Sequence, residues 1–142
     1  NPAPGPPPFM RQSVPSVAYG GSSYLVVWQD GRPGTSNDDV YGARVSQAGT
    51  VLDATGIPIS SAANDESAPS VAFGGTNYLV AWQDTRSGSD VYGARVSPGG
   101  TVLDPNGIAV ATAAGEQLAP SVTFDGTNTA PAIESSSRAV AA

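Results

Sequence analysis

The side chains that could do chemistry in this sequence are carboxylates, arginines and tryptophans, and most of them recur at matched places. The matched sets are Trp28, Asp30 and Arg32 and, 54 positions later, Trp82, Asp84 and Arg86. Each aspartate–arginine pair could hold a polar or anionic ligand at one rim of an assembly of the repeats. Alternatively, the aspartate accepts bonds from turn amides while the arginine pairs across the loop with Asp39 or Asp90, which fixes the hairpin.

The two tryptophans also have two interpretations. A tryptophan on an accessible face could stack on a sugar ring, as in a lectin. The alternative is packing between sheets, which is the usual role of a tryptophan in a strand that is apolar on both faces. We therefore expect Trp28 and Trp82 to be core residues, and we keep both as candidate ligand contacts together with Arg32 and Arg86.

Oxygen ligands gather in the loop that follows the first set. Asp30, Asp38 and Asp39 lie there, and the second repeat retains Asp84 and Asp90 at the matching places. Carboxylate oxygens are ligands that calcium prefers. These five residues are therefore candidate calcium ligands, although the alternating carboxylates and bidentate glutamate of an EF-hand loop are missing. We expect no other cofactor.

Composition excludes most catalytic chemistry. The 142 residues contain no Cys and no His, and arginine supplies all six positive charges because Lys is absent. Thiolate zinc sites, Ser–His and Cys–His nucleophiles and lysine Schiff bases are thus impossible. Paired carboxylates remain, but Asp38 and Asp39 are neighbours whose side chains point apart on an extended chain. We predict no catalytic residues and no enzymatic activity.

Charge and hydropathy exclude two classes of partner. The formal net charge is -6 and the isoelectric point is about 4.2, which disfavours sequence-independent binding to nucleic acid or anionic membranes. No apolar run reaches the roughly 18 residues of a membrane-spanning helix. We expect neither a nucleic-acid partner nor a membrane span.

The chain is mostly one pattern written more than twice. The pattern PSVA(Y/F)GG followed by YLV(V/A)WQD occupies 15–30 and 69–84, and its opening part returns at 120–128. The segments DVYGARVS at 39–46 and TVLD at 50–53 recur 51 positions later. The three-residue difference lies between Asp30 and Asp39, in a loop where an insertion costs little. The predicted organisation is a Pro-rich arm at 1–14, repeats at 15–68 and 69–119, and a partial repeat with a tail at 120–142.

Alternating apolar residues and frequent turn residues predict strands and not helices. In the first repeat we expect strands at 16–19, 24–29 and 40–46, a fourth stretch at 50–53, and an edge strand at 57–59. The second strand is apolar on both faces, which indicates burial between two layers. Pro58 cannot donate to an inner ladder, so its strand belongs at an edge.

A four-stranded antiparallel unit of about 50 residues, buried on both faces, is typical of a β-propeller blade. The segments YLVVWQD, DVYGARVS and TVLD resemble the secreted β-propeller-type repeats of bacteria and, more distantly, WD40-like or TolB-type blades. The resemblance spans 15–128 and implies an all-β fold of tandem blade-like repeats, incomplete in one chain. A β-sandwich and a β-solenoid remain the alternatives.

The third repeat departs from the pattern, because TAPAIESSSRAVAA follows Asn128 where YLVVWQD is expected. We expect the buried strand to be missing there. Two complete blades and part of a third cannot close a ring, so both end sheets would expose apolar faces. The sequence therefore predicts a homo-oligomer or filament, formed by blade stacking or by strand donation between copies.

These observations favour a non-enzymatic structural or adhesive protein that assembles with its own copies. The absence of Lys, the acidic balance and the abundance of small polar residues favour a secreted bacterial protein at the cell surface or outside the cell. The alternatives are a carbohydrate-binding, lectin-like propeller module and a fragment of a larger propeller protein.

Overall fold

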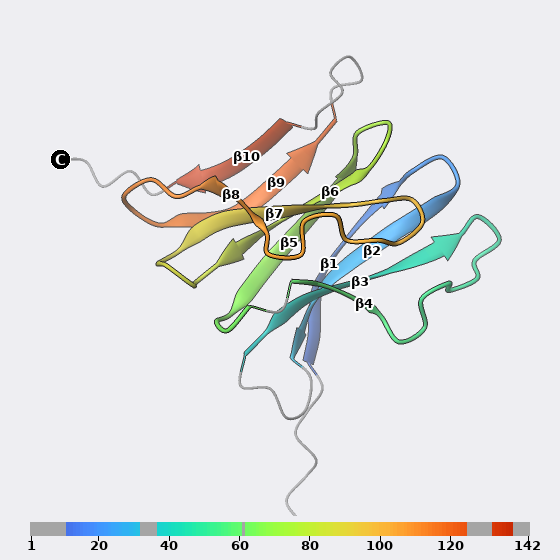
Figure 1. Ribbon diagram of the computed structural model, residues 1–142, viewed down its shortest axis with the longest axis horizontal. Coiled ribbons are helices and arrows are strands. Elements are labelled where there is room, and N and C mark those ends of the chain that lie inside the picture. The colour runs from blue at the N-terminus through green and yellow to red at the C-terminus, as the bar shows by residue number, and fades with distance from the viewer. Residues whose placement is uncertain (1–10, 32–36, 61, 125–131, 138–142) are drawn as a thin grey trace, which may run out of the picture.

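The computed structural model describes residues 11–31, 37–60 and 62–124, together with the backbone of 132–137. These described residues form three antiparallel sheets, which follow one another in chain order (Figure 1). The first sheet comprises β1 (Arg11–Tyr19), β2 (Ser23–Gly31), β3 (Asp39–Ser46) and β4 (Ile57–Ser60). The second comprises β5 (Glu66–Phe73), β6 (Tyr78–Asp84), β7 (Asp90–Val96) and β8 (Ile108–Ala111), and the third comprises β9 (Gln117–Thr123) and β10 (Ala132–Ser137).

The two full repeats fold into equivalent sheets. Each has its strands in sequence order, and the cross-strand partners correspond: Val17 faces Val26 in the first sheet, and Val71 faces Val80 in the second. The prediction of an all-β fold with tandem four-stranded antiparallel sheets is confirmed. Pro58 lies in β4 at a sheet edge, as expected from its missing amide proton.

The stretch TVLD does not form the fourth strand of a sheet, contrary to the expectation for 50–53. Val51 makes only an isolated bridge with Val45, and the strand that pairs with β3 is β4. The reason is local: Asp53 accepts hydrogen bonds from the Arg44 backbone and side chain, so the segment folds back as a turn. The second repeat does the same.

The first strand of each repeat is longer than expected and carries an irregularity. The register shifts between Ser13 and Ser16 in β1 and at the matching place in β5. At this point Val14, Ala68 and Ala119 have positive φ angles of 52°, 51° and 43°. Residues other than glycine rarely adopt this backbone conformation. The first strand is therefore strained and bent at the same position in all three repeats.

The third repeat forms a hairpin, although its sequence led us to expect that the second strand is missing. The backbone of β10 pairs with β9, and Ser121 faces Glu134. In the second sheet, Ser70 faces Ala81. The residues at the matching positions of the third repeat are Ser121 and Ala132, so Ala132 would be the expected partner of Ser121. The pairing is therefore displaced by two positions, a shift that keeps the alternation of faces.

The sheets stack front to back, and each junction has its own apolar core. Residues of both full sheets fill the first junction: Leu25, Val27, Val40, Ile59, Val71, Tyr78, Val80, Trp82, Ala94 and Val96. A smaller cluster of Ala72, Ala81, Val91 and Val122 fills the second. The part of the chain that is described forms an open stack and no closed ring. It contains no helix long and apolar enough to cross a membrane.

Candidate functional site

The outer face of the first sheet exposes the residues that the second sheet buries. Tyr78 and Trp82 have no exposed surface. Their equivalents in the first sheet are Tyr24, which is 41% exposed, and Trp28, which is half-buried. The expectation that both tryptophans are core residues therefore holds fully for Trp82 alone, because a neighbouring sheet covers only that one.

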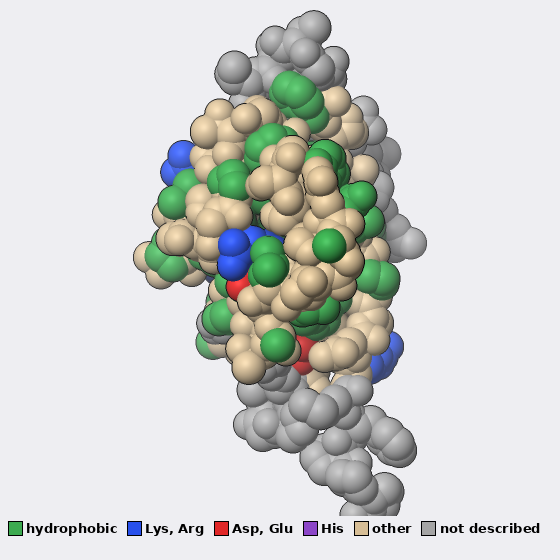
Figure 2. All heavy atoms as spheres, turned by 90° about the vertical axis from the view of Figure 1, so that its right-hand side faces the viewer, with side chains coloured by type: hydrophobic (Ala, Val, Ile, Leu, Met, Phe, Trp, Pro, Cys, Tyr) green, Lys and Arg blue, Asp and Glu red, His purple; other side chains and the backbone are tan. Residues whose placement is uncertain are grey.

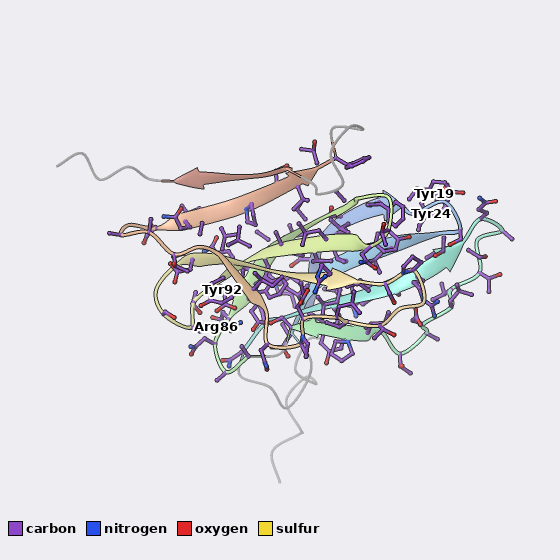
Figure 3. The ribbon with its side chains drawn as sticks, turned by 45° about the horizontal axis from the view of Figure 1, so that its top comes forward. Tyr19, Tyr24, Arg86 and Tyr92 are labelled. Carbon is purple, nitrogen blue, oxygen red and sulfur yellow. The ribbon has the colours of Figure 1, made fainter. Side chains whose placement is uncertain are left out.

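This outer surface, which we call the open face, combines apolar and polar side chains. Val14 and Val17 of β1 are 50% and 58% exposed. A shallow hollow of about 220 Å³ lies beside them and is lined by Gln12, Ser13, Pro15, Val26 and Trp28. Tyr19 and Tyr24 form a tilted aromatic pair at one end of the sheet (Figure 3).

The junction between the first two sheets shows how such a face is covered. Phe73 and Tyr78 form the pair equivalent to Tyr19 and Tyr24, with the same 5.0 Å between ring centroids. The Tyr78 hydroxyl donates to the carbonyl oxygen of Ser23. A Cβ on Gly20 would lie 2.5 Å from Cζ of Tyr78, so only glycine leaves room for this ring.

A second cluster surrounds Arg86 at the end of the second sheet. Its Nε and Nη2 atoms donate to the two carboxylate oxygens of Asp84 at 3.0 and 2.7 Å, and Nη1 donates to the carbonyl oxygen of Asn106. The guanidinium lies 4.0 Å from the ring centroid of Tyr92 (Figure 3). Asp84 also accepts from the Arg86 amide, as expected of a turn aspartate. The expected partner across the loop was wrong, because Arg86 pairs with Asp84 and not with Asp90.

The electrostatics of this pair follow from its position. Burial by itself raises the pKa of Asp84, but hydrogen bonds from Arg86 and Trp82 together hold it below its usual value. The carboxylate is thus charged, fully buried and neutralised by a guanidinium. A charge so paired has little left to offer a ligand, which makes the pair a structural element. Arg32, the equivalent in the first repeat, lies outside the described residues.

The other two strand arginines pair within their own repeats. Arg44 binds Asp53, and Arg95 binds Asp104, each with two side-chain bonds and one backbone bond to the aspartate. In both repeats the partner is the aspartate of TVLD. These pairs explain why the motif recurs with its aspartate.

Sequence reasoning missed Glu66, which is fully buried at the first junction. Its Oε1 accepts from the Ala62 amide, while Oε2 has no hydrogen-bond partner among the described residues. Burial raises the pKa of Glu66 to about 7, and the nearby charges of Asp84 and Asp39 act in the same direction. The repeat alignment carried a signal, because Gln12 and Gln117 occupy the matching positions.

The five candidate calcium ligands are distributed over two sheets. Asp30 faces Asp39, and Asp84 faces Asp90, in adjacent strands. Asp30 accepts from Trp28 at 2.8 Å, and Asp38 accepts from Gln29. Within the described ranges no group of three or more acidic side chains is arranged to hold a metal ion.

A wider hollow lies along the second sheet beside β9. Its volume is about 1020 Å³, and its walls are the loop before β7, the ring of Tyr92 and the segment 112–116. The lining is mostly Ser, Gly and Ala. At the first junction, the corresponding segment is bonded by Thr85, whose amide and hydroxyl donate to the Asp65 carbonyl.

No family model matches the chain, and neither a curated protein nor a solved structure is significantly similar to it.

Proposed function

We propose that this protein is a non-enzymatic structural or adhesive scaffold that assembles by stacking its sheets against those of other copies. The observation that carries the proposal is the open face, on which Tyr24, Val26 and Trp28 occupy the places of three side chains that are completely buried in the second sheet. Burying apolar surface yields about 25 cal/mol per Å². Covering this face therefore stabilises an assembly.

The mode of packing supports a propagating assembly. In both junctions the back of one sheet meets the front of the next, so the contact is heterologous. A heterologous contact repeats between copies until it closes a ring or grows as a fibre. In a ring the sheets would act as propeller blades, with β1, β5 and β9 as the inner strands. An extracellular setting, at or beyond a bacterial surface, belongs to the same proposal.

The surface of the molecule also suits association more than charge-driven binding. Seen from the end that carries the β1–β2 turn, uncharged side chains predominate (Figure 2). Three of the arginines are already bound to aspartates of the same chain. An association through these surfaces depends on apolar burial and hydrogen bonds, and should resist added salt.

Light scattering after size-exclusion chromatography tests the scaffold. We expect the full chain to elute at multiples of 14.2 kDa, and Val26→Asp to shift the population toward the monomer because it places a charge on the open face. Leu103→Asp is the matched control, since Leu103 is 40% exposed on a turn away from this face. A wild-type chain that remains monomeric at all concentrations would contradict the proposal.

A carbohydrate-binding module is the second candidate, and one observation favours it. Trp28 is half-buried beside a hollow whose lining includes the polar side chains of Gln12 and Ser13. An accessible indole with polar neighbours is suited to stacking on a sugar ring. A glycan array discriminates the two: glycan binding by a monomer, lost in Trp28→Ala, would favour the lectin, whereas absence of binding by an assembled wild type favours the scaffold.

A further inference from the structure

The two junctions inside the chain are built with the same hydrogen bonds. At the first, the Val71 amide donates to Oγ of Ser16 at 3.3 Å. At the second, the Val122 amide donates to Oγ of Ser70 at 3.1 Å. Ser16 and Ser70 are equivalent, and so are Val71 and Val122. A serine on the first strand of one sheet therefore receives the amide of the next sheet's first strand.

A second bond recurs at the strained position of the strand. The Ala68 amide donates to Oε1 of Gln29, and the Ala119 amide to Oε1 of Gln83, both at 3.4 Å. Ala68 and Ala119 are the residues with positive φ. The irregularity thus directs the backbone amide toward the neighbouring sheet. The hydrogen bond that this amide donates to a glutamine offsets the backbone strain.

A backbone bond completes the set. The Glu66 amide donates to the Asp38 carbonyl at the first junction, and the Gln117 amide donates to the Ser89 carbonyl at the second. Three bonds at each junction therefore fix one register between successive sheets. Because both junctions obey it, the register is a property of the repeat.

The outermost strands present the two halves of a third such junction. Val17 matches Val71 in its cross-strand register, so its amide points away from β2. Val14 has the positive φ of Ala68. At the other end of the stack, Ser121 matches Ser16 and Ser70 and is exposed on the outer side of β9. One end carries the donors, and the other carries the acceptor.

We infer that a second copy of this chain docks with the outer side of its β9 on β1, so that Ser121 of one copy accepts the Val17 amide of the other. This inference rests on the proposed function and specifies its partner and register. In the sequence of the third repeat, Asp125 replaces Gly20 and Gly74, and Gly20 is the residue that leaves room for the Tyr78 ring at the first junction. We therefore assign the contact to the strands and not to packing of the Tyr24 ring.

Thiol cross-linking of the full chain tests the register, since the wild type contains no Cys. The variant with Val17→Cys and Ser121→Cys, treated with a short bismaleimide, should give a ladder of dimers and larger species on a denaturing gel. The matched positive control is Ser16→Cys with Val71→Cys, which should link within one chain and add no dimer. Val17→Cys with Leu103→Cys is the negative control.

The strength of association, measured without a cross-linker, tests the hydrogen bond to Ser121 by itself. Ser121→Ala should weaken association roughly 2- to 10-fold, the value of one hydrogen bond. Thr123→Ala, on the same exposed side of β9, should leave it unchanged. Dimers from the single variant Val17→Cys would show a face-to-face contact and overturn the inference. Assembly without any 17–121 link would overturn the register and leave the scaffold standing, whereas absence of assembly would overturn both.

Discussion

At the scale of single residues, the row of polar side chains at the end of each sheet shows how one substitution separates otherwise equal repeats. Gln12 donates to Asp30 in the first sheet, but Glu66 stands at the matching place beside Asp84. A glutamine can donate to the neighbouring carboxylate, and a charged glutamate repels it. The second repeat therefore holds a buried acid where an amide would be satisfied.

Glu66→Gln should stabilise the protein at neutral and alkaline pH. The native pKa of Glu66 is about 7 against an ordinary value of 4.5, so between these values the folded chain holds a proton that the unfolded chain has lost. The wild-type free energy of unfolding must then fall as pH rises through this window. Urea denaturation should show Glu66→Gln more stable at pH 8 by about 2 to 3 kcal/mol. Identical pH dependence in the two proteins would contradict the burial of a proton at Glu66.

Arg86→Ala should destabilise the fold much more than Arg95→Ala. Removing Arg86 leaves the fully buried carboxylate of Asp84 without its cation, at a cost of about 3 kcal/mol. Arg95 has the same bidentate contact with Asp104, but 53% of its side chain is exposed. Water can therefore solvate the Asp104 carboxylate when Arg95 is removed. Chemical denaturation of both variants compares them directly; equal losses would mean that burial of the pair is irrelevant.

At the scale of elements, the repeat explains what could be predicted and what could not. The strands at 24–29, 40–46 and 57–59 were predictable, because alternation and turn residues are local signals. The turn at TVLD was not, since it depends on Asp53 reaching back to Arg44. Likewise Trp28 and Trp82 have the same sequence context, and only the stacking order makes one half-exposed and the other buried.

Gly20→Ala tests the contact that joins the first two sheets. The added methyl group would overlap the ring of Tyr78, so we expect a loss of about 1 to 3 kcal/mol in the free energy of unfolding. Gly99→Ala is the matched control, because its nearest neighbour outside the adjoining residues is Oγ of Ser97 at 3.7 Å, and it should change stability by less than about 0.5 kcal/mol. Thermal denaturation measures both. Equal stability of the two variants would argue against close packing of the Tyr78 ring on Gly20.

At the scale of the whole molecule, the three sheets are successive units of one stack, and the stack has a direction. Its first face consists of Val17, Tyr24, Val26 and Trp28 on β1 and β2, and its last includes Ser121 on β9. In the proposed assembly this direction would join copies head to tail, and the angle between sheets would decide between ring closure and fibre growth. Electron microscopy distinguishes these two forms.

Hydrogen exchange at two protein concentrations tests the central claim most directly. Docking on β1 should slow exchange in the segment 11–19 as concentration rises, while the outer strand at 57–60 exchanges equally at both concentrations. That difference would place the contact between copies on the open face. Exchange in 11–19 that does not depend on concentration, over a range from dilute to concentrated solution, would contradict the account.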